Sequence, residues 1–390
     1  MTVDKRICPT CHQSSSHFLD WLYSGLNASV FNYTAQFCHC PSCGLIYVDN
    51  IDDEQLAHFY ADECSYSEKA HFDITSPANI AKYTCYRDVM TNYGLANVQV
   101  TDVGCGRGGF LLWLNANGWQ ADGHGVDVDI KSMPNSEIQQ KDDGYVVQFQ
   151  QGGALSLPYA EDSQQLLTYF HVFEHIRDID AVLNEAHRVL ESGGHILIEV
   201  PDAEHYSKQP VGSAFWIGIR EHIYHFSAQA LIAALNRHGF NVISVRRDML
   251  PTPEFDYPSL MVLAKKGGVN TDLDCESGDD IATFVVSSQQ ALLKQAEQIT
   301  LLVQHHSALT FWGCSAELFS LLPLLGDLDF ALCDASVPKQ QSRYKGRPIQ
   351  DPSQIKPEGI LVVAPYLHSD VIEQTALSLG WPQQLIYRLT

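Results

Sequence analysis

The chain has 390 residues, of which 45% are hydrophobic and 18% are charged, so it can build two to three packed domains. The 46 Asp and Glu residues outnumber the 24 Lys and Arg residues, and the formal net charge of −22 argues against a general binder of polyanionic nucleic acid. No apolar run is long enough to span a membrane, and the first residues lack the apolar stretch of a signal peptide. We therefore expect a cytoplasmic protein without membrane or nucleic-acid partners.

Five of the 11 cysteines lie within residues 8–43. They include two CxxC pairs, made of Cys8, Cys11, Cys40 and Cys43. Two such pairs can surround one Zn²⁺ tetrahedrally, and four thiolates leave no position for a reacting water, so the predicted zinc is structural. The alternatives are a redox CxxC and unrelated buried cysteines. Other residues that could replace a zinc ligand are Cys38, His12 and His39.

From about residue 75, predicted strands alternate with predicted helices, which is typical of a doubly wound parallel α/β sheet. A strand predicted over residues 97–103 leads into a loop, residues 104–109, with the sequence GCGRGG, and a helix follows. Glycines at a strand end let the backbone approach a ligand. The next predicted strand ends at Asp127, where such a sheet places the acid that binds a ribose diol. The alternatives are a glycine-rich turn without a ligand and a dinucleotide-binding loop.

The GxGxGG spacing, preceded by Asp102, resembles the first motif of class I S-adenosylmethionine-dependent methyltransferases. Residues 145–173 fit that family's third and fourth strands, and residues 188–201 fit the turn before its fifth strand and the strand itself. The resemblance covers about residues 75–265 and implies a Rossmann-like methyltransferase sheet that binds S-adenosyl-L-methionine. A relic of the fold that has lost its cofactor is the alternative from another functional class.

The resemblance implies roles for individual residues. It assigns Asp102, Gly104 and Gly106 to the methionine end of the cofactor, and Asp127 to the ribose hydroxyls. It assigns the adenine to Ala154 and Leu155, and we separately expect His171, at the end of the fourth strand, to face the transferred methyl. The chain departs from the family at Gly153, where many members have an acid, and at Gln164-Gln165, where they usually have Phe-Asp.

Methyl transfer to most acceptors requires removal of a proton, and titratable groups concentrate in residues 171–175 and 220–227. We predict that His222 is the general base and that Glu221 supports it. The other candidates for proton transfer are Tyr224 and His225. The alternative is that Ser227 caps the next helix and that the histidines only decorate a loop.

A smaller α/β unit is predicted beyond an acidic linker at residues 271–280. It comprises a helix at about 281–306, a strand at 309–312, the loop GCSAE at 313–317, a strand ending at Asp334 and a strand at 360–363. The loop lacks the glycines of a dinucleotide fingerprint, which argues against NAD.

With the zinc module and the central unit, this last unit makes the whole chain resemble the C-methyltransferases of nucleotide-linked deoxysugars. The quoted motifs are Cys43-Gly44-Leu45-Ile46-Tyr47, Phe59-Tyr60, residues 313–317, Asp334 with Pro338-Lys339, and residues 344–349. The resemblance divides the chain into a zinc-binding module, a methyltransferase domain and a Rossmann-like substrate-binding unit. Their predicted bounds are 1–72, 73–268 and 269–390.

Two departures from that family bear on the acceptor. Ile219 and Arg220 stand where the family has Tyr and His before the Glu-His of the base, and Glu317 replaces a lysine. We predict C-methylation of a sugar nucleotide, with O- or N-methylation of another small metabolite and a non-catalytic zinc-containing binding protein as the alternatives. The residues that could contact a phosphate are Arg220, Lys339, Lys345 and Arg347.

Overall fold

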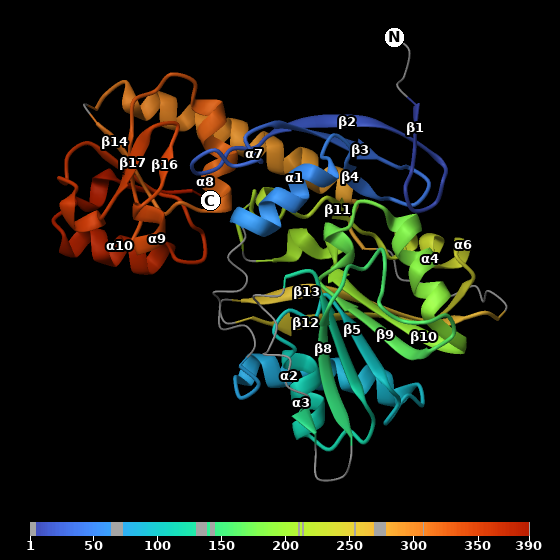
Figure 1. Cartoon of the computed structure of the whole chain (residues 1–390). Helices are drawn as coiled ribbons and strands as arrows, with labels where there is room; N and C mark the ends of the chain where they lie inside the picture. Colours follow the sequence, from blue (N-terminus) through green and yellow to red (C-terminus); the bar gives the residue numbers. More distant parts are fainter. Residues whose placement is uncertain are drawn as a thin grey trace.

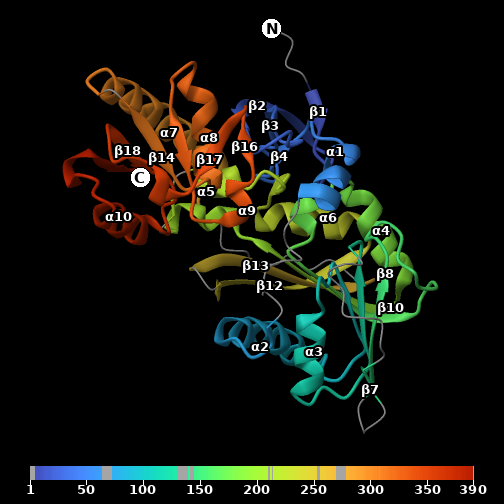
Figure 2. The ribbon, with the colours of Figure 1, turned by 60° about the vertical axis from the view of Figure 1, so that its left-hand side comes forward.

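The computed structural model describes residues 5–63, 73–129, 139–140, 145–209, 211–212, 214–252, 255–268, 278–306 and 308–389. Its strands form three sheets, and the two smaller sheets lie side by side beyond one end of the large central sheet (Figures 1 and 2). The predicted α/β class is confirmed. Most of the predicted linker, residues 271–277, lies outside the described residues.

The N-terminal sheet is antiparallel, in the order β1-β2-β3-β4-β11. Its strands are β1 (Lys5–Ile7), β2 (Ser14–Leu22), β3 (Thr34–His39), β4 (Ile46–Val48) and β11 (Tyr224–His225). The last strand comes from the central part of the chain, because Tyr224 pairs with Tyr47 and His225 with Ile46. Helix α1 (Asp53–His58) and the π-helix η1 (Phe59–Glu63) follow this sheet in the chain.

The central sheet has eight strands in the order β12-β13-β10-β9-β5-β6-β8-β7. Their bounds are β5 (Val100–Val103), β6 (Gly123–Asp127), β7 (Gln139–Gln140), β8 (Val146–Gln151), β9 (Gln164–Phe170), β10 (Leu190–Pro201), β12 (Phe240–Pro251) and β13 (Asp256–Lys266). Strands β5, β6, β8, β9 and β10 are parallel, and β13 runs antiparallel between β10 and β12. The chain winds outward from β5 through β6 to β8 and then returns to β9, so the switch point at which such sheets bind ligands lies between β5 and β9.

Helices cover both faces of the central sheet, with α2 (Pro77–Asn92) and α3 (Gly109–Ala116) on one face and α4 (Ile179–Val189) and α6 (Ala228–Arg237) on the other (Figure 1). Helix α4 begins at the N-cap Asp178, whose side chain accepts the N–H of Ala181 at 2.9 Å. Its buried residues recur at helical spacing, which directs one apolar face at the sheet. The short helix η3 (Phe173–His175) follows β9. After β10 come two more short helices, η4 (Ala203–Lys208) and α5 (Phe215–Gly218).

The C-terminal sheet has the order β16-β17-β15-β14-β18-β19. Its strands are β14 (Leu309–Trp312), β15 (Ala331–Cys333), β16 (Arg343–Tyr344), β17 (Arg347–Gln350), β18 (Ile360–Val363) and β19 (Ile386–Arg388). All neighbours are parallel except the β16–β17 hairpin. The helices of this unit are α7 (Ile281–Val303), α8 (Ala316–Leu321), η5 (Leu322–Leu325), α9 (Val337–Gln340), η6 (Pro352–Gln354), α10 (Ser369–Ser378) and η7 (Gln383–Leu385).

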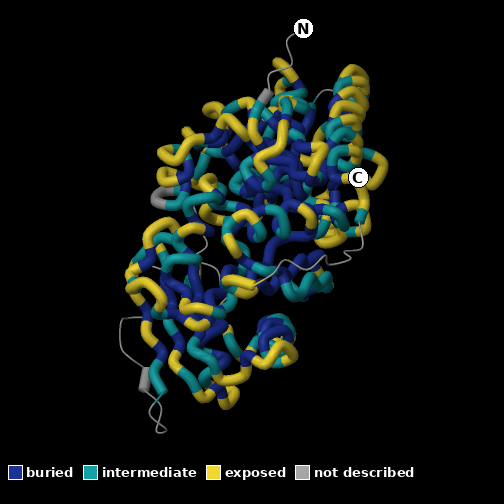
Figure 3. Tube along the Cα trace, turned by 90° about the vertical axis from the view of Figure 1, so that its right-hand side faces the viewer, coloured by how far each residue is buried: buried dark blue, intermediate teal, exposed yellow. Residues whose placement is uncertain are grey.

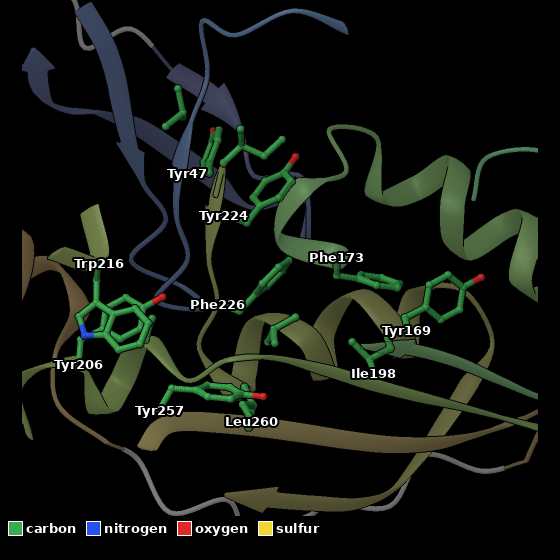
Figure 4. Packing of buried hydrophobic residues seen from close by; sticks show 14 of the residues in the cluster. Tyr47, Tyr169, Phe173, Ile198, Tyr206, Trp216, Tyr224, Phe226, Tyr257 and Leu260 are labelled. Carbon is green, nitrogen blue, oxygen red and sulfur yellow. The ribbon is translucent and has the colours of Figure 1, made fainter. Parts of the chain in front are cut away.

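Buried apolar side chains form one large cluster that includes residues of all three sheets, among them Phe37, Val262 and Phe311. Figure 3 shows buried segments throughout the interior of both lobes. In the close-up of Figure 4, Phe226 lies between Tyr224, on the side of the N-terminal sheet, and Leu260 of β13. The predicted domain bounds stay a proposal, and the three units share one continuous core. No helix of the described residues is long and apolar enough to cross a membrane.

Candidate active site and metal centre

The predicted glycine loop joins β5 to α3 and takes up a backbone that favours glycine. Gly104 has a φ of +75° and Gly106 a φ of +52°. A Cβ atom at Gly104 would lie 2.5 Å from Val172 Cγ2, so packing against the loop after β9 requires this glycine. A Cβ atom at Gly106 would meet nothing within 4 Å, so the backbone here is open to a ligand. The Gly106 N–H donates to Asp127 Oδ2 at 2.8 Å, which draws the ends of β5 and β6 together.

Asp102 and Asp127 stand at adjacent strand ends, and burial raises the pKa of each. Asp102 is 4% exposed, and its pKa rises to about 7, although a hydrogen bond from Thr168 Oγ1 at 2.7 Å opposes the shift. The other oxygen of Asp127, Oδ1, accepts the N–H of Asp129 at 2.8 Å. Their predicted contacts with the cofactor, Asp102 with the amine and Asp127 with the ribose diol, stay a proposal.

An apolar surface adjoins Asp127. Leu155 is 51% exposed, and Val128, which sequence reasoning missed, is 58% exposed. The two loops that carry them lie together, because a Cβ atom on Gly153 would be 3.7 Å from Val128 Cγ1. Ala154 is half-buried beside them. Exposed apolar side chains on both loops suit the flat face of an aromatic base, and Val128 could have been noticed as a lone apolar residue between two aspartates.

His171 follows β9 with a φ of +56° and lies between two fully buried carboxylates. Its Nδ1 donates to Glu174 Oε1 at 3.1 Å, and its Nε2 lies 2.8 Å from the hydroxyl of Tyr257 and 3.4 Å from Glu199 Oε2. Burial lowers the pKa of His171, but the charges of Glu199 and Glu174 more than offset it and leave the pKa raised. The predicted site thus includes a charged network.

Sequence reasoning missed Glu199, although it is a lone carboxylate in the apolar run HILIEVP. Its Oε1 accepts from the hydroxyls of Tyr257 at 3.0 Å and Ser259 at 2.7 Å. Burial lowers the pKa of Lys82 on α2, and the negative charge of Glu199 opposes this shift. A buried carboxylate with several donors fixes the position of the histidine that it contacts.

His222, the predicted base, is 7% exposed and lies against His175, with the ring centroids 4.8 Å apart. Burial holds the pKa of His222 well below its ordinary value, so the ring is uncharged. The preceding Glu221 is half-buried, and its backbone carbonyl accepts a hydrogen bond from His175 Nδ1 at 3.1 Å. The base assignment stays a proposal.

Tyr224 and His225 lie in β11 and hold the N-terminal sheet against the central unit. The Tyr224 hydroxyl donates to the carbonyl of Arg177 at 2.6 Å, and Figure 4 shows this ring beside Tyr47. His225 is fully buried, stacked on Phe37 with centroids 5.9 Å apart. Both side chains are buried and cannot reach a bound methyl acceptor in this arrangement, which favours a structural role for both.

The two CxxC pairs meet. Cys8 Sγ lies 3.7 Å from Cys43 Sγ, and Cys11 Sγ lies 3.5 Å from Cys40 Sγ. All four sulfur atoms are within 4.8 Å of one another. A tetrahedron with Zn–S bonds of about 2.3 Å has sulfur–sulfur edges of about 3.8 Å, so the cluster is compatible with a structural zinc ion.

The turns around the cluster are alike. The N–H of His12 donates to the carbonyl of Cys8 at 3.0 Å, and the N–H of Gly44 donates to that of Cys40 at 2.8 Å. Both residues have positive φ values, +56° for His12 and +75° for Gly44. His12 therefore takes the turn position that glycine takes in the second pair.

The alternative ligands have other partners. Cys38 accepts from Arg6 Nη1 at 3.1 Å, and the ring of His39 lies 5.7 Å from that of Phe18. His12 Nε2 lies 2.9 Å from Asp180 Oδ2. The geometry favours the four predicted cysteines as the ligand set.

All four cations predicted to contact a phosphate have protein partners, and that of Lys345 is the ring of Tyr344, 5.6 Å from its Nζ. The guanidinium of Arg220 is 5.1 Å from the Phe31 ring centroid and donates to the carbonyl of Ser24 at 2.8 Å. Lys339 Nζ donates to the Cys314 carbonyl at 2.9 Å and pairs with Asp334, and Arg347 donates to the Phe330 carbonyl at 3.0 Å. The phosphate contact is therefore poorly supported for Arg220, Lys339 and Arg347.

The part of the chain that carries this site is similar to known methyltransferases. Residues 80–245 match the family model described as a methyltransferase domain. This match covers less than half of the chain and supports a methyltransferase fold for these residues. The matched range contains the glycine loop, Asp127, His171 and His222, so the predicted cofactor and acceptor regions both fall within it.

Curated relatives match the same part of the chain. The methyltransferase GfsG of Streptomyces halstedii is 33% identical over 105 residues, which are 26% of this chain and 37% of that protein. The demethylmenaquinone methyltransferase of a Roseiflexus species is 34% identical over 109 residues, which are 27% of this chain and 44% of that protein. The chain spans less than half the length of these relatives.

Among solved structures, an S-adenosylmethionine-dependent methyltransferase from Mesorhizobium loti aligns with 47% of this chain and 97% of its own. The identity is 18% and the TM-score is 0.38, so this likeness carries no part of the assignment.

Proposed function

We propose that the protein transfers a methyl group from S-adenosyl-L-methionine to a polar small molecule. The observation that carries the proposal is the open backbone at Gly106, tied by its N–H to Asp127 at 2.8 Å, within residues that match a methyltransferase domain. S-adenosyl-L-methionine supplies an activated methyl group when it is bound.

Different residues would contact different parts of the cofactor and the acceptor. Asp127 would accept the ribose hydroxyls, and Val128 with Leu155 would cover the adenine. Asp102 would face the amino end of the methionine. His171, held between Glu174 and Glu199, would fix the wall of the site beside the methyl group. The acceptor would lie next to His171 and His222, where His222 can accept its proton directly.

For the acceptor, we propose a nucleotide-linked sugar, on the strength of the resemblance of the whole chain to the sugar C-methyltransferases. The internal partners of Arg220, Lys339 and Arg347 favour the second candidate, O- or N-methylation of a small metabolite without a phosphate.

Calorimetric titration of the full chain with S-adenosyl-L-methionine tests the cofactor, with Asp127→Ala as the comparison variant. We expect micromolar binding to the wild type and at least a tenfold weaker affinity for the variant. No binding to the wild type below millimolar concentration would refute the function. A screen of nucleotide-sugars and hydroxylated metabolites for methyl uptake, followed by location of the methyl group on carbon, oxygen or nitrogen, separates the two acceptors.

A further inference from the structure

Three side chains from two loops converge beside the candidate active site. Glu174 and His175 lie in η3, after β9, and His222 lies in the loop before β11. One ligand atom from each residue lies within 4.8 Å of the others. A main-chain hydrogen bond holds the two loops together, since the N–H of Ile223 donates to the carbonyl of Glu174 at 2.9 Å.

The tautomer of His175 follows from its hydrogen bond. Its Nδ1 lies 3.1 Å from the backbone carbonyl of Glu221, and a carbonyl can only accept, so Nδ1 carries the proton. With a single proton on Nδ1, the ring presents a lone pair at Nε2, and Glu174 Oε1 lies 3.8 Å from that atom. Two acceptors face each other across a gap that a cation would fill. A histidine fixed through Nδ1 to a carbonyl is the usual arrangement of an Nε2 metal ligand.

Two polar atoms of this group are buried without a hydrogen-bond partner among the described residues: Glu174 Oε2 and His222 Nδ1. Glu174 is 0% exposed and His222 is 7% exposed. Leaving such atoms unpaired is unfavourable, most of all for a charged group, so a folded protein normally supplies a partner.

We propose that Glu174, His175 and His222 bind a divalent transition-metal ion, distinct from the predicted zinc in the cysteine cluster. Two imidazoles and one carboxylate suit Mn²⁺, Fe²⁺, Co²⁺ or Zn²⁺ and leave positions for oxygen ligands. The three ligand atoms have to move together by less than about 2 Å to reach bonding distances of about 2.0–2.2 Å. The ion would hold an oxygen of the acceptor, and His222 would then be a ligand instead of the direct proton acceptor.

Binding of Mn²⁺ to the full chain loaded with one equivalent of Zn²⁺, which the four cysteines take first, is followed by electron paramagnetic resonance and tests the site without cofactor or acceptor. Its result is therefore independent of the proposed methyl transfer. Thiolates bind Zn²⁺ in preference to Mn²⁺, so the cysteine cluster does not compete. Glu174→Gln keeps the volume and an acceptor for His171 but removes the charge. Glu199→Gln is the matched control, because Glu199 is equally buried and contacts the other side of His171.

We expect one Mn²⁺ per chain in the wild type and in Glu199→Gln, and at least a tenfold weaker affinity in Glu174→Gln. His175→Gln should weaken binding to a similar extent, and thermal unfolding identifies any variant that fails to fold. Absence of Mn²⁺, Co²⁺ and Zn²⁺ binding beyond the cysteine cluster in the wild type would overturn the proposal. Unchanged affinity in both folded variants would overturn it as well, and in either case His222 would keep the direct role in proton transfer.

Discussion

The hydroxyl of Ser227 donates a hydrogen bond to the backbone carbonyl of Cys43, so the second CxxC turn is attached to the start of α6. The same oxygen accepts the N–H of Ala230 at 3.0 Å and caps the helix. At the other end of α6, Arg237 donates to the carbonyl of Thr10 in the first CxxC turn at 2.7 Å. Both halves of the cysteine cluster are thereby fixed to one helix, which follows the loop that carries His222.

This attachment predicts different effects for two buried cysteines. Cys40→Ser removes a member of the cluster, so Co²⁺ added to the metal-free chain should give little thiolate–metal absorption, and the melting temperature should fall by several degrees. Cys38→Ser changes a buried cysteine of the same sheet outside the cluster and should keep both properties close to the wild type. Equal absorption in the two variants would contradict the assigned ligand set.

The glycine loop can be tested against a matched glycine. Gly106 and Gly118 both have positive φ values, +52° and +87°, and a Cβ atom at either would meet nothing within 4 Å. Alanine at each position should therefore cost a similar free energy of unfolding, about 1–2 kcal/mol. Calorimetry should show at least tenfold weaker cofactor binding for Gly106→Ala only. If Gly118→Ala lost affinity to the same degree, backbone strain and not ligand contact would explain the loss.

The raised pKa of Asp102 predicts a pH-dependent stability. With a pKa of about 7 in the folded chain and 3.8 as its ordinary value, Asp102 keeps a proton that the unfolded chain has already released between these two pH values. The folded state binds more protons there, so this residue lowers the free energy of unfolding as the pH rises to about 7, and adds no further slope above that.

Asp102→Asn removes this titration and keeps an acceptor for Thr168. Its stability relative to the wild type should increase by up to about 1.4 kcal/mol per pH unit between pH 5 and 7 and then level off. Thermal unfolding of both proteins at pH 5, 6, 7 and 8 measures the difference. A difference that does not change with pH would show that Asp102 is already ionised in the folded protein.

Tyr224→Phe separates a structural from a catalytic role. The change removes the hydrogen bond to the Arg177 carbonyl and leaves that acceptor unpaired, so we expect a loss of about 1–3 kcal/mol in the free energy of unfolding. Cofactor affinity and the rate of methyl transfer should stay within about twofold of the wild type. A large loss of rate without a loss of stability would restore Tyr224 as a group in proton transfer.

Local patterns in the sequence predicted several of the elements at the residues where the structure has them. The strands at 309–312 and 360–363 lie at the predicted residues, and α6 begins after the predicted cap Ser227. Glycine spacing and the carboxylate at the end of β6 depend on neighbouring residues, because backbone conformation and strand ends are set locally. The CxxC pairs are local turns, and their meeting in space was predicted from the zinc ion that four cysteines could share.

Only the tertiary structure decided which titratable groups face one another. The motif at residues 220–227 reads as one set of candidates, yet the fold turns His222 toward His175 and Glu174 and buries Tyr224 and His225 against the N-terminal sheet. The pairing of strand β11 with strand β4 cannot be predicted from local sequence, because it joins segments more than a hundred residues apart. Burial, pKa and the lone pair that His175 presents all depend on such long-range contacts, which composition and spacing do not encode.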